Sequence, residues 1–241
     1  MTQSKTAAVL FTGGKDSMRT IELMLERGYD ISCLVTMISD NEDSYMLHTA
    51  AIEVTRLSAK ALGIPLFVGR TAGIKEKELE DIYSAIREVS ESYSFDTLAS
   101  GGIASVYQRD RISSLCQRLG LKTEAPLWGV DQPSYLKDLV LRNYQFILTS
   151  VSAEGLDRSW LGREINGSNV EEIIGLARKN RFNPSFEGGE AETLVLDCPL
   201  FKSKKLKILK SEINWRGSCG RLLIKDAVLV PKKRQEYSSL A

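Results

Sequence analysis

The stretch AAVLFTGGKDS, residues 7–17, decides the fold of this chain. Its first part, Ala7–Phe11, is a short apolar run of the kind that forms a buried strand. The segment Lys15–Arg27 then places apolar residues at helical spacing. Between the two stands the pair Gly13-Gly14, which lets the backbone turn sharply. A strand, a tight turn and a helix predict the opening of a βαβ unit.

The same alternation continues through the first half of the chain. Ile31–Ile38, Pro65–Val68 and Thr97–Ala99 are strand-like runs. Lys75–Tyr93 places apolar residues three and four apart and predicts a long amphipathic helix. Strands that alternate with helices predict an α/β fold with a doubly wound parallel sheet, whose ligand site lies beyond the carboxyl ends of its strands.

The second half has a different pattern, and we expect a smaller α+β domain there. We place the boundary so that residues 1–122 form the first domain and residues 123–241 the second. Leu121–Pro133 is linker-like, and Ser168 with Glu171 predicts the cap of a helix that runs to Asn180. The other expected elements are a helix at Tyr135–Arg142 and strands at Phe146–Val151, Thr193–Leu196, Leu206–Trp215 and Arg221–Val230.

Overall charge and hydropathy exclude several classes of protein. The chain has 241 residues, with 32 Lys and Arg against 31 Asp and Glu, so its formal net charge is +1. This balance gives no reason to expect nucleic acid or an anionic membrane as partner. No apolar run approaches the roughly 18 residues that cross a bilayer, and Met1–Lys5 has no signal-peptide core. We therefore expect a cytoplasmic protein.

The cysteine and histidine content excludes two further kinds of site. The four cysteines are widely separated and form no Cys-x-x-Cys pair, so we expect free thiols in a reducing compartment. His48 is the one histidine, which excludes a His-rich metal site and argues against a hydrolase of the triad type.

The segment Thr12–Ser17 carries the chemistry that the residues themselves predict. Glycines allow close approach of a ligand, and the following helix offers N–H groups and a positive dipole end to a phosphate. The spacing differs from the Walker pattern. Asp16 beside a phosphate calls for a cation between them, which favours Mg²⁺. The alternative is that Gly13-Gly14 is only a tight turn before a helix.

Taken whole, this segment resembles the S-G-G-x-D-S loop of the ATP pyrophosphatases, with Thr12 in place of the leading Ser. The resemblance implies the adenine nucleotide alpha-hydrolase (HUP-like) fold. It also implies that ATP and Mg²⁺ bind here, that the loop holds the departing pyrophosphate, and that the product of the first step is an adenylate. Lys15 and Asp16 would then be catalytic, and Asp16 the metal ligand. The whole loop would bind the nucleotide through Thr12, Gly13, Gly14, Lys15, Asp16 and Ser17.

Five motifs in order resemble the diphthine–ammonia ligase family. They are Tyr45–Thr49, Ser100–Arg111, Pro126–Trp128, Val151–Asp157 and Glu187–Thr193. The resemblance implies ATP-dependent amidation of diphthine on translation elongation factor 2, with ammonium as nitrogen donor and AMP and pyrophosphate as products. Sulfur transfer is disfavoured because cysteine pairs are lacking, and no glutaminase site can be assembled. The chain departs from the family at Phe186, where a glycine is usual, and at Ala191, where an aromatic residue is common.

The resemblance extends the expected nucleotide site to His48, Ser100 and Gly101-Gly102. The glycine pair comes just after a predicted strand and before a helix whose Ser105 and Gln108 are typical of a capping box. It would serve the α-phosphate or the ribose, unless it is simply another turn. His48 would contact adenine or ribose, or else only cap its own helix.

The remaining expected site residues would bind the second substrate. Gln108 and Arg111 share one helical face, with Arg111 directed at a phosphate or a carboxylate, or else at solvent. The acidic loop, Glu187–Glu192, would attract the trimethylammonium group of diphthine or ammonium, and a carboxylate there could take a proton. Without the resemblance it is a polar surface loop. The expected contacts are Tyr107, Gln108, Arg111, Glu187, Gly188, Gly189, Glu190 and Glu192, with Glu187 and Glu190 also catalytic.

Two rival functions stay open from the sequence. One keeps adenylation but acts on another substrate, such as a tRNA base, and the modest net charge argues against it. The other makes the chain a non-catalytic regulatory module that binds ATP. The basic runs at 202–210 and 232–234 would contact a partner or simply face solvent.

Overall fold

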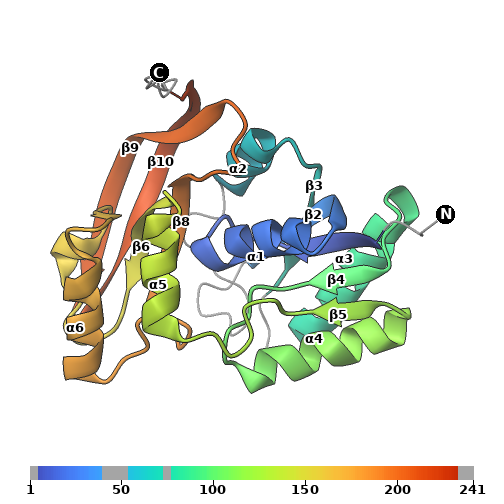
Figure 1. Cartoon of the computed structure of the whole chain (residues 1–241), viewed down its shortest axis with the longest axis horizontal. Coiled ribbons are helices and arrows are strands. Elements are labelled where there is room, and N and C mark those ends of the chain that lie inside the picture. The colour runs from blue at the N-terminus through green and yellow to red at the C-terminus, as the bar shows by residue number, and fades with distance from the viewer. Residues whose placement is uncertain (1–4, 40–53, 73–76, 233–241) are drawn as a thin grey trace, which may run out of the picture.

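The structure, a computed structural model, describes residues 5–39, 54–72 and 77–232. Figure 1 shows two sheets side by side, each with its own helices. The elements of the first half are β1 (Lys5–Leu10), α1 (Lys15–Glu26), β2 (Tyr29–Ser39), α2 (Thr55–Leu62), β3 (Leu66–Thr71), α3 (Lys77–Ser92), β4 (Thr97–Ala99), α4 (Val106–Leu119) and β5 (Lys122–Glu124).

The first sheet is parallel and has the order β3-β2-β1-β4-β5. The chain moves outward from β1 to β2 and β3, then returns to the other side of β1 for β4 and β5. The strand order therefore reverses between β1 and β4, which is where ligands bind in open α/β sheets. The prediction of a doubly wound parallel α/β fold is confirmed. The linker-like interpretation of Leu121–Pro133 is wrong at its start, because β5 lies there and pairs with β4.

Alternate residues of β1 pack on opposite faces of this sheet. Ala7 and Val9 belong to a core cluster with Met18 and Ile21 of α1, which covers one face. Ala8 belongs to a second cluster with residues of α3 and α4, which cover the other. Because both faces of the sheet are covered, the central strand is apolar from Ala7 to Leu10.

The second half is built on an antiparallel sheet, in which β6 pairs with β7, β8 and β10, and β10 pairs with β9. The helices α5 and α6 lie together beside it (Figure 1). The α+β expectation for this half is confirmed. Its elements are α5 (Gln132–Leu141), β6 (Gln145–Val151), a 3₁₀ turn (Arg158–Trp160), β7 (Glu164–Ile165), α6 (Val170–Asn180), β8 (Ala191–Asp197), β9 (Lys204–Arg216) and β10 (Cys219–Pro231).

The predicted cap of α6 is wrong. The N-cap residue is Asn169, and its side chain does not cap the helix. Instead Asn169 accepts a hydrogen bond from the Asn166 backbone N–H and donates one to the Glu164 carbonyl. Ser168 donates its hydroxyl to the Asn166 side chain, 2.6 Å away. The side chains of this turn therefore stabilise the turn itself rather than the first N–H groups of the helix.

A single core cluster joins the two halves. It runs from Val9 and Met18 in the first half to Phe146, Leu148 and Val195 in the second. The domain boundary near residue 122 stays a prediction, but the α1 face of the parallel sheet is covered in part by the second half. The second half thereby reaches the carboxyl end of β1.

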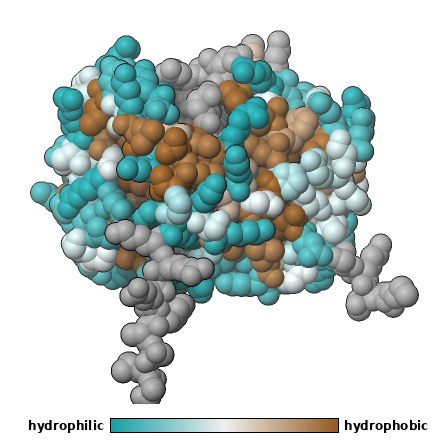
Figure 2. All heavy atoms as spheres, turned by 90° about the horizontal axis from the view of Figure 1, so that it is seen from above, coloured by the Kyte–Doolittle hydropathy of each residue, from teal (hydrophilic) through white to brown (hydrophobic). Residues whose placement is uncertain are grey.

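The described residues also bear on the predictions for membrane-spanning segments and for the cysteines. In the described part of the chain, no helix is both long and apolar enough to cross a membrane. Figure 2, a view from above, shows apolar residues gathered in the middle of that face with hydrophilic side chains around them. The prediction of free thiols is confirmed: Cys33, Cys116 and Cys198 are buried and Cys219 is exposed. Burial raises the pKa of Cys33 and of Cys198 to about 12.

Candidate nucleotide site

Two glycine turns flank the point where the strand order reverses. The first turn, Thr12–Ser17, leaves the end of β1, and the second turn, Ser100–Ala104, leaves the end of β4. They lie against one another, since a side chain on Gly101 would come within 2.9 Å of the Asp16 carbonyl carbon. Gly101 is therefore required for backbone to pack on backbone.

The first turn needs both of its glycines. Gly13 has a φ of +79°, in the left-handed region that favours glycine. Gly14 precedes α1 in an extended conformation, and a side chain there would lie 3.1 Å from the Thr193 carbonyl oxygen. The predicted strand, turn and helix are confirmed, and the crowding explains why the second position also lacks a side chain.

Hydroxyl groups organise the N–H donors of this turn. Thr12 Oγ1 accepts from the Gly14 N–H at 3.3 Å, and Thr193 Oγ1 accepts from the Lys15 N–H at 3.1 Å. Ser17 Oγ accepts from the Thr12 N–H and donates to the Gly14 carbonyl. The turn is also joined to β8, because the Val195 N–H donates to the Gly13 carbonyl at 3.0 Å. Its shape thus depends on a strand of the second half.

The Lys15 ammonium is buried beneath the turn. Its side chain is 1% exposed, and Nζ donates to both Asp16 carboxylate oxygens, at 2.9 and 2.8 Å, and to the Ser185 carbonyl at 2.6 Å. The Phe186 ring covers it, with the centroid 5.5 Å from Nζ. All three ammonium protons thus have an acceptor in this arrangement. Lys15 neutralises Asp16 from behind and ties α1 to the 183–190 segment.

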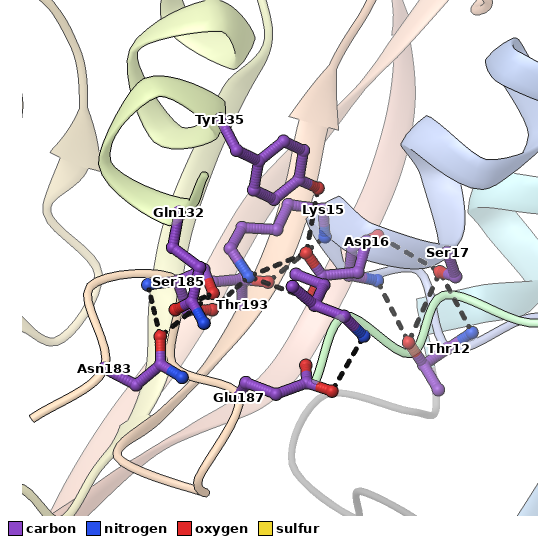
Figure 3. Close-up of polar contacts among 12 residues, drawn as sticks. Thr12, Lys15, Asp16, Ser17, Gln132, Tyr135, Asn183, Ser185, Glu187 and Thr193 are labelled. Carbon is purple, nitrogen blue, oxygen red and sulfur yellow. Dashed lines mark hydrogen bonds and ion pairs between the residues drawn. The ribbon is translucent and has the colours of Figure 1, made fainter. Parts of the chain in front are cut away.

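Tyr135 of α5 completes this cluster and was not identified from the sequence. Its hydroxyl donates to Asp16 Oδ1 at 2.8 Å, although 119 residues separate the two in the chain (Figure 3). Burial, and then the neighbouring carboxylate, raise the pKa of Tyr135 well above its usual range, so the hydroxyl keeps its proton. An aromatic residue near the start of an amphipathic helix gives no signal that separates this role from ordinary core packing.

Phe186 stands in the left-handed region, with a φ of +65°. This is the position where the sequence departs from the glycine that is usual in the family it resembles. The backbone here has a conformation that favours glycine, and the buried Phe186 ring stacks near Phe182, with centroids 6.4 Å apart. Packing of the ring over Lys15 offsets a conformation that an aromatic residue otherwise avoids.

The second turn holds a carboxylate. Glu187 Oε1 accepts from the Ile103 N–H at 2.9 Å and from the Ala104 N–H at 3.2 Å. The predicted N-cap of α4 is confirmed, since Ser105 Oγ accepts from the Gln108 N–H. The N–H groups that follow the glycine pair therefore bind a carboxylate of the acidic loop in this structure, and the contact of this turn with the α-phosphate or the ribose stays a prediction.

Glu190 folds the acidic loop upon itself. Its two carboxylate oxygens accept from the Asn183 N–H at 2.9 Å and from the Gly188 N–H at 2.7 Å. Gly189 has a φ of +83°, which the tight loop requires. The expected acidic cluster is therefore three separate groups, with Glu187 on the second turn, Glu190 inside its own loop, and Glu192 on the wall of a cavity.

Two adjoining cavities open at the glycine turns. The first has a volume of about 150 Å³ and apolar walls from Leu10, Val35, Met37, Ile82 and Ile112. The second, of about 60 Å³, is lined mainly by polar groups, including Lys15, Glu192 and Thr193. Four residues line both cavities: Thr12, Asp16, Gln108 and Glu187. An apolar slot that continues into a polar one across a glycine turn has the form of a nucleotide site.

Some of the other expected site residues line the cavities, and others do not. Ser100 and both glycines of the second turn line the apolar cavity. Tyr107 is 40% exposed, and the Arg111 guanidinium lies 4.2 Å from its ring, so these two side chains stack on each other at the surface of α4. His48 and the Tyr45–Thr49 motif lie outside the described residues.

Of the carboxylates that line the cavities, Asp16 is the one that we expect to hold a metal. Within the described residues, no group of three or more His, Cys, Asp or Glu side chains forms a metal cluster. Mg²⁺ does not need one, because it commonly takes one or two carboxylates together with substrate phosphates and water. Asp16 fits this requirement, since its side chain is 27% exposed and lines both cavities.

Comparison with known families decides the assignment. The family described as diphthamide synthase matches in both parts, its N-terminal domain over residues 5–123 and its C-terminal domain over residues 131–230. The chain belongs to the diphthamide synthase family. The resemblance found in the sequence motifs is confirmed. Members of the family share with this chain both the glycine-turn half and the half that carries the acidic loop.

Individual relatives cover most of the chain. A human protein named diphthine–ammonia ligase is 33% identical over 225 residues, which is 86% of this chain and 84% of the human one. The protein of the same name from Danio rerio is 34% identical and covers 81% of this chain and 83% of its own. The one from Schizosaccharomyces pombe is 33% identical over 220 residues, and this chain spans about a third (36%) of its length.

Two solved structures are similar to the chain at low scores. A chain described as a predicted subunit of tRNA methyltransferase from Methanocaldococcus jannaschii gives a TM-score of 0.42 at 20% identity, covering 81% of this chain and 98% of that one. A tRNA thiolase from Methanococcus maripaludis gives a TM-score of 0.38 at 16% identity, covering 78% and 71%. Neither likeness bears on the reaction.

Proposed function

We propose that this chain is a diphthine–ammonia ligase, which uses ATP and ammonium to amidate diphthine on a protein substrate and releases AMP and pyrophosphate. Membership of the diphthamide synthase family supports the proposal. The observation that carries it is the pair of cavities that share Thr12, Asp16, Gln108 and Glu187. Adenine fits the apolar slot, and the phosphates fit the polar end at the first glycine turn.

In the proposed reaction the diphthine carboxylate oxygen attacks the α-phosphorus of ATP, and the bond from that phosphorus to the pyrophosphate oxygen breaks. Ammonia nitrogen then attacks the acyl carbon, and the acyl–oxygen bond to AMP breaks. Ammonium must first give up a proton, for which Glu192 at the polar cavity is our candidate acceptor. The residues of the first turn align the phosphates, which is the main requirement of phosphoryl chemistry.

We assign neutralisation of the phosphate charge of ATP to groups around Asp16. We propose that Asp16 holds Mg²⁺, which when bound would neutralise the phosphate charge. Lys15, bonded to Asp16 at 2.8 Å, balances the charge of this carboxylate and holds it oriented toward the cavities. The protein substrate is proposed to be translation elongation factor 2, on the strength of the family resemblance.

The products test the proposal directly. The purified chain, incubated with diphthine-modified elongation factor 2, ATP and ammonium, should release AMP and pyrophosphate in equal amounts and add one amide to the factor. Release of ADP would contradict attack at the α-phosphorus. Turnover that instead requires tRNA, with strongly salt-sensitive tRNA binding, would favour the tRNA-base alternative. Binding of ATP without turnover on any of these substrates would favour a regulatory module.

A further inference from the structure

The geometry points to Tyr135 as a positioning residue, through which the second half holds the Asp16 carboxylate in the orientation that binds metal-bound ATP. The inference rests on the nucleotide role proposed for Thr12–Ser17. It adds a residue from α5, outside the glycine turns and outside the acidic loop. Figure 3 shows the Tyr135 hydroxyl beside Asp16 and above Lys15.

The hydrogen-bond pattern assigns this role to the Tyr135 hydroxyl. Asp16 Oδ1 receives two donors, the Lys15 ammonium at 2.9 Å and the Tyr135 hydroxyl at 2.8 Å. Lys15 is the chain neighbour of Asp16 on the same helix turn, so its bond moves with α1. Tyr135 belongs to α5 and supplies the contact that fixes Asp16 relative to the rest of the site. A hydrogen bond to a charged group in a partly buried place is among the stronger ones.

The same helix also fixes the far side of the cluster. Gln132 Oε1 accepts from the Ser185 hydroxyl at 2.7 Å, and the Ser185 carbonyl accepts from the Lys15 ammonium at 2.6 Å. One turn of α5 therefore holds Asp16 directly and Lys15 through Ser185. Asp131 begins the helix by accepting from the Ser134 N–H, which fixes this turn at its start. The Asp16 carboxylate is thus held by hydrogen bonds from Lys15 of α1 and Tyr135 of α5, while Asp16 lines both cavities.

The chain offers a matched control in Tyr144. Its hydroxyl donates to Glu22 of the same helix α1 at 2.6 Å, and it is buried like Tyr135. Glu22 lies beyond the first turn of α1 and away from the glycine turn. Tyr135→Phe and Tyr144→Phe each remove one buried hydroxyl that bonds to a carboxylate of α1, and both keep the ring that fills the core. Both should therefore lower the melting temperature to a similar extent.

The test measures ATP binding calorimetrically, with excess Mg²⁺ and with EDTA. We expect Tyr135→Phe to raise the Kd for ATP with Mg²⁺ about tenfold, because one hydrogen bond to a charged group is lost. In EDTA, the Kd of the variant should stay within about twofold of the wild-type value. Tyr144→Phe should change neither. The inference is wrong if Tyr135→Phe weakens ATP binding equally with and without Mg²⁺. It is also wrong if the Tyr135→Phe and Tyr144→Phe variants bind ATP with the same Kd. If the wild-type chain does not bind ATP with Mg²⁺ at all, the proposed function fails instead.

A double mutant separates positioning from loss of structure. In the Asp16→Asn background, Tyr135→Phe should add less than about a twofold change to Kd with Mg²⁺, because the carboxylate whose orientation it fixes is gone. A further tenfold loss in that background would show that Tyr135 acts elsewhere and would overturn the inference.

Discussion

The two glycine turns of this protein look alike in sequence and differ in what they require of glycine. In the first turn, Gly13 supplies a positive φ and Gly14 makes room for Thr193 of the second half. In the second turn, Gly101 lies on the backbone of Asp16, whereas a side chain on Gly102 would meet open space. The first turn is built around a buried cation, Lys15, and the second binds a carboxylate. A glycine pair after a strand therefore does not by itself tell which of its residues is indispensable.

The largest effect is expected from the first turn. Asp16→Asn keeps an acceptor for Tyr135 but removes the charge that faces Lys15 and the proposed metal. Turnover should fall by about a hundredfold or more, as when one preorganised electrostatic contact is lost at a catalytic centre. Measurement of AMP release by the wild type and the variant, with circular dichroism as a folding control, checks this. A folded variant with near wild-type turnover would show that the carboxylate of the first turn is not needed for the reaction. The first turn would then not be the more important of the two for catalysis.

The next effect concerns stability at the contact between the turns. Gly101→Ala places a methyl group 2.9 Å from the Asp16 carbonyl carbon and 3.1 Å from the Ser17 nitrogen, both backbone atoms that cannot rotate away. Such overpacking typically costs about 1–3 kcal/mol in the free energy of unfolding. Urea denaturation of both chains gives the difference. A loss below about 0.5 kcal/mol would mean that the turns separate easily, contrary to the close packing described here.

A smaller effect is expected from the carboxylate on the second turn. Glu187→Gln keeps an oxygen for the Ile103 and Ala104 N–H groups but removes a negative charge that lines both cavities. ATP should bind roughly threefold to fivefold more tightly in EDTA, because a partly exposed like charge is worth at most about 1 kcal/mol. Calorimetry on the free protein checks this. Weaker binding would indicate that Glu187 orders the second turn for the nucleotide rather than competing with it.

The smallest effect is expected at Gly102, the matched control for Gly101. A side chain there meets no atom within 4 Å, and its φ lies outside the left-handed region. Gly102→Ala should change the free energy of unfolding by less than about 0.5 kcal/mol. The same urea titration serves as the measurement. A loss comparable with that of Gly101→Ala would show that this position also depends on the conformational freedom of glycine.

Local pattern was enough to predict the first half of the fold. The strands around Val9, Val35 and Leu98 and the helices at Lys15–Arg27 and Lys75–Tyr93 follow from the sequence because period and turn residues agree along the chain. The pattern failed where it was short or ambiguous. The edge strand β5 has only three residues, and its sequence resembles a linker. Ser168 has the spacing of a helix cap, but the N-cap position of the helix is Asn169. Three-residue strands and adjacent polar residues carry too little local signal to decide such cases.

The residues of the first turn were enough to determine that a strand, a glycine turn and a helix follow one another, and they predict a carboxylate for a cation and a nucleotide as ligand. Only the tertiary structure decided which distant groups contact this turn. The Tyr135 hydroxyl bonds to the Asp16 carboxylate, while Ser185 and Thr193 accept hydrogen bonds from Lys15, and these partners lie between 119 and 178 residues away along the chain. The tertiary structure also decided that Glu187 bonds to the second turn and Glu190 to its own loop. The physical reason is that sequence periodicity reports contacts within one turn of a helix or along one strand, whereas hydrogen bonds between distant segments depend on how two sheets share one core.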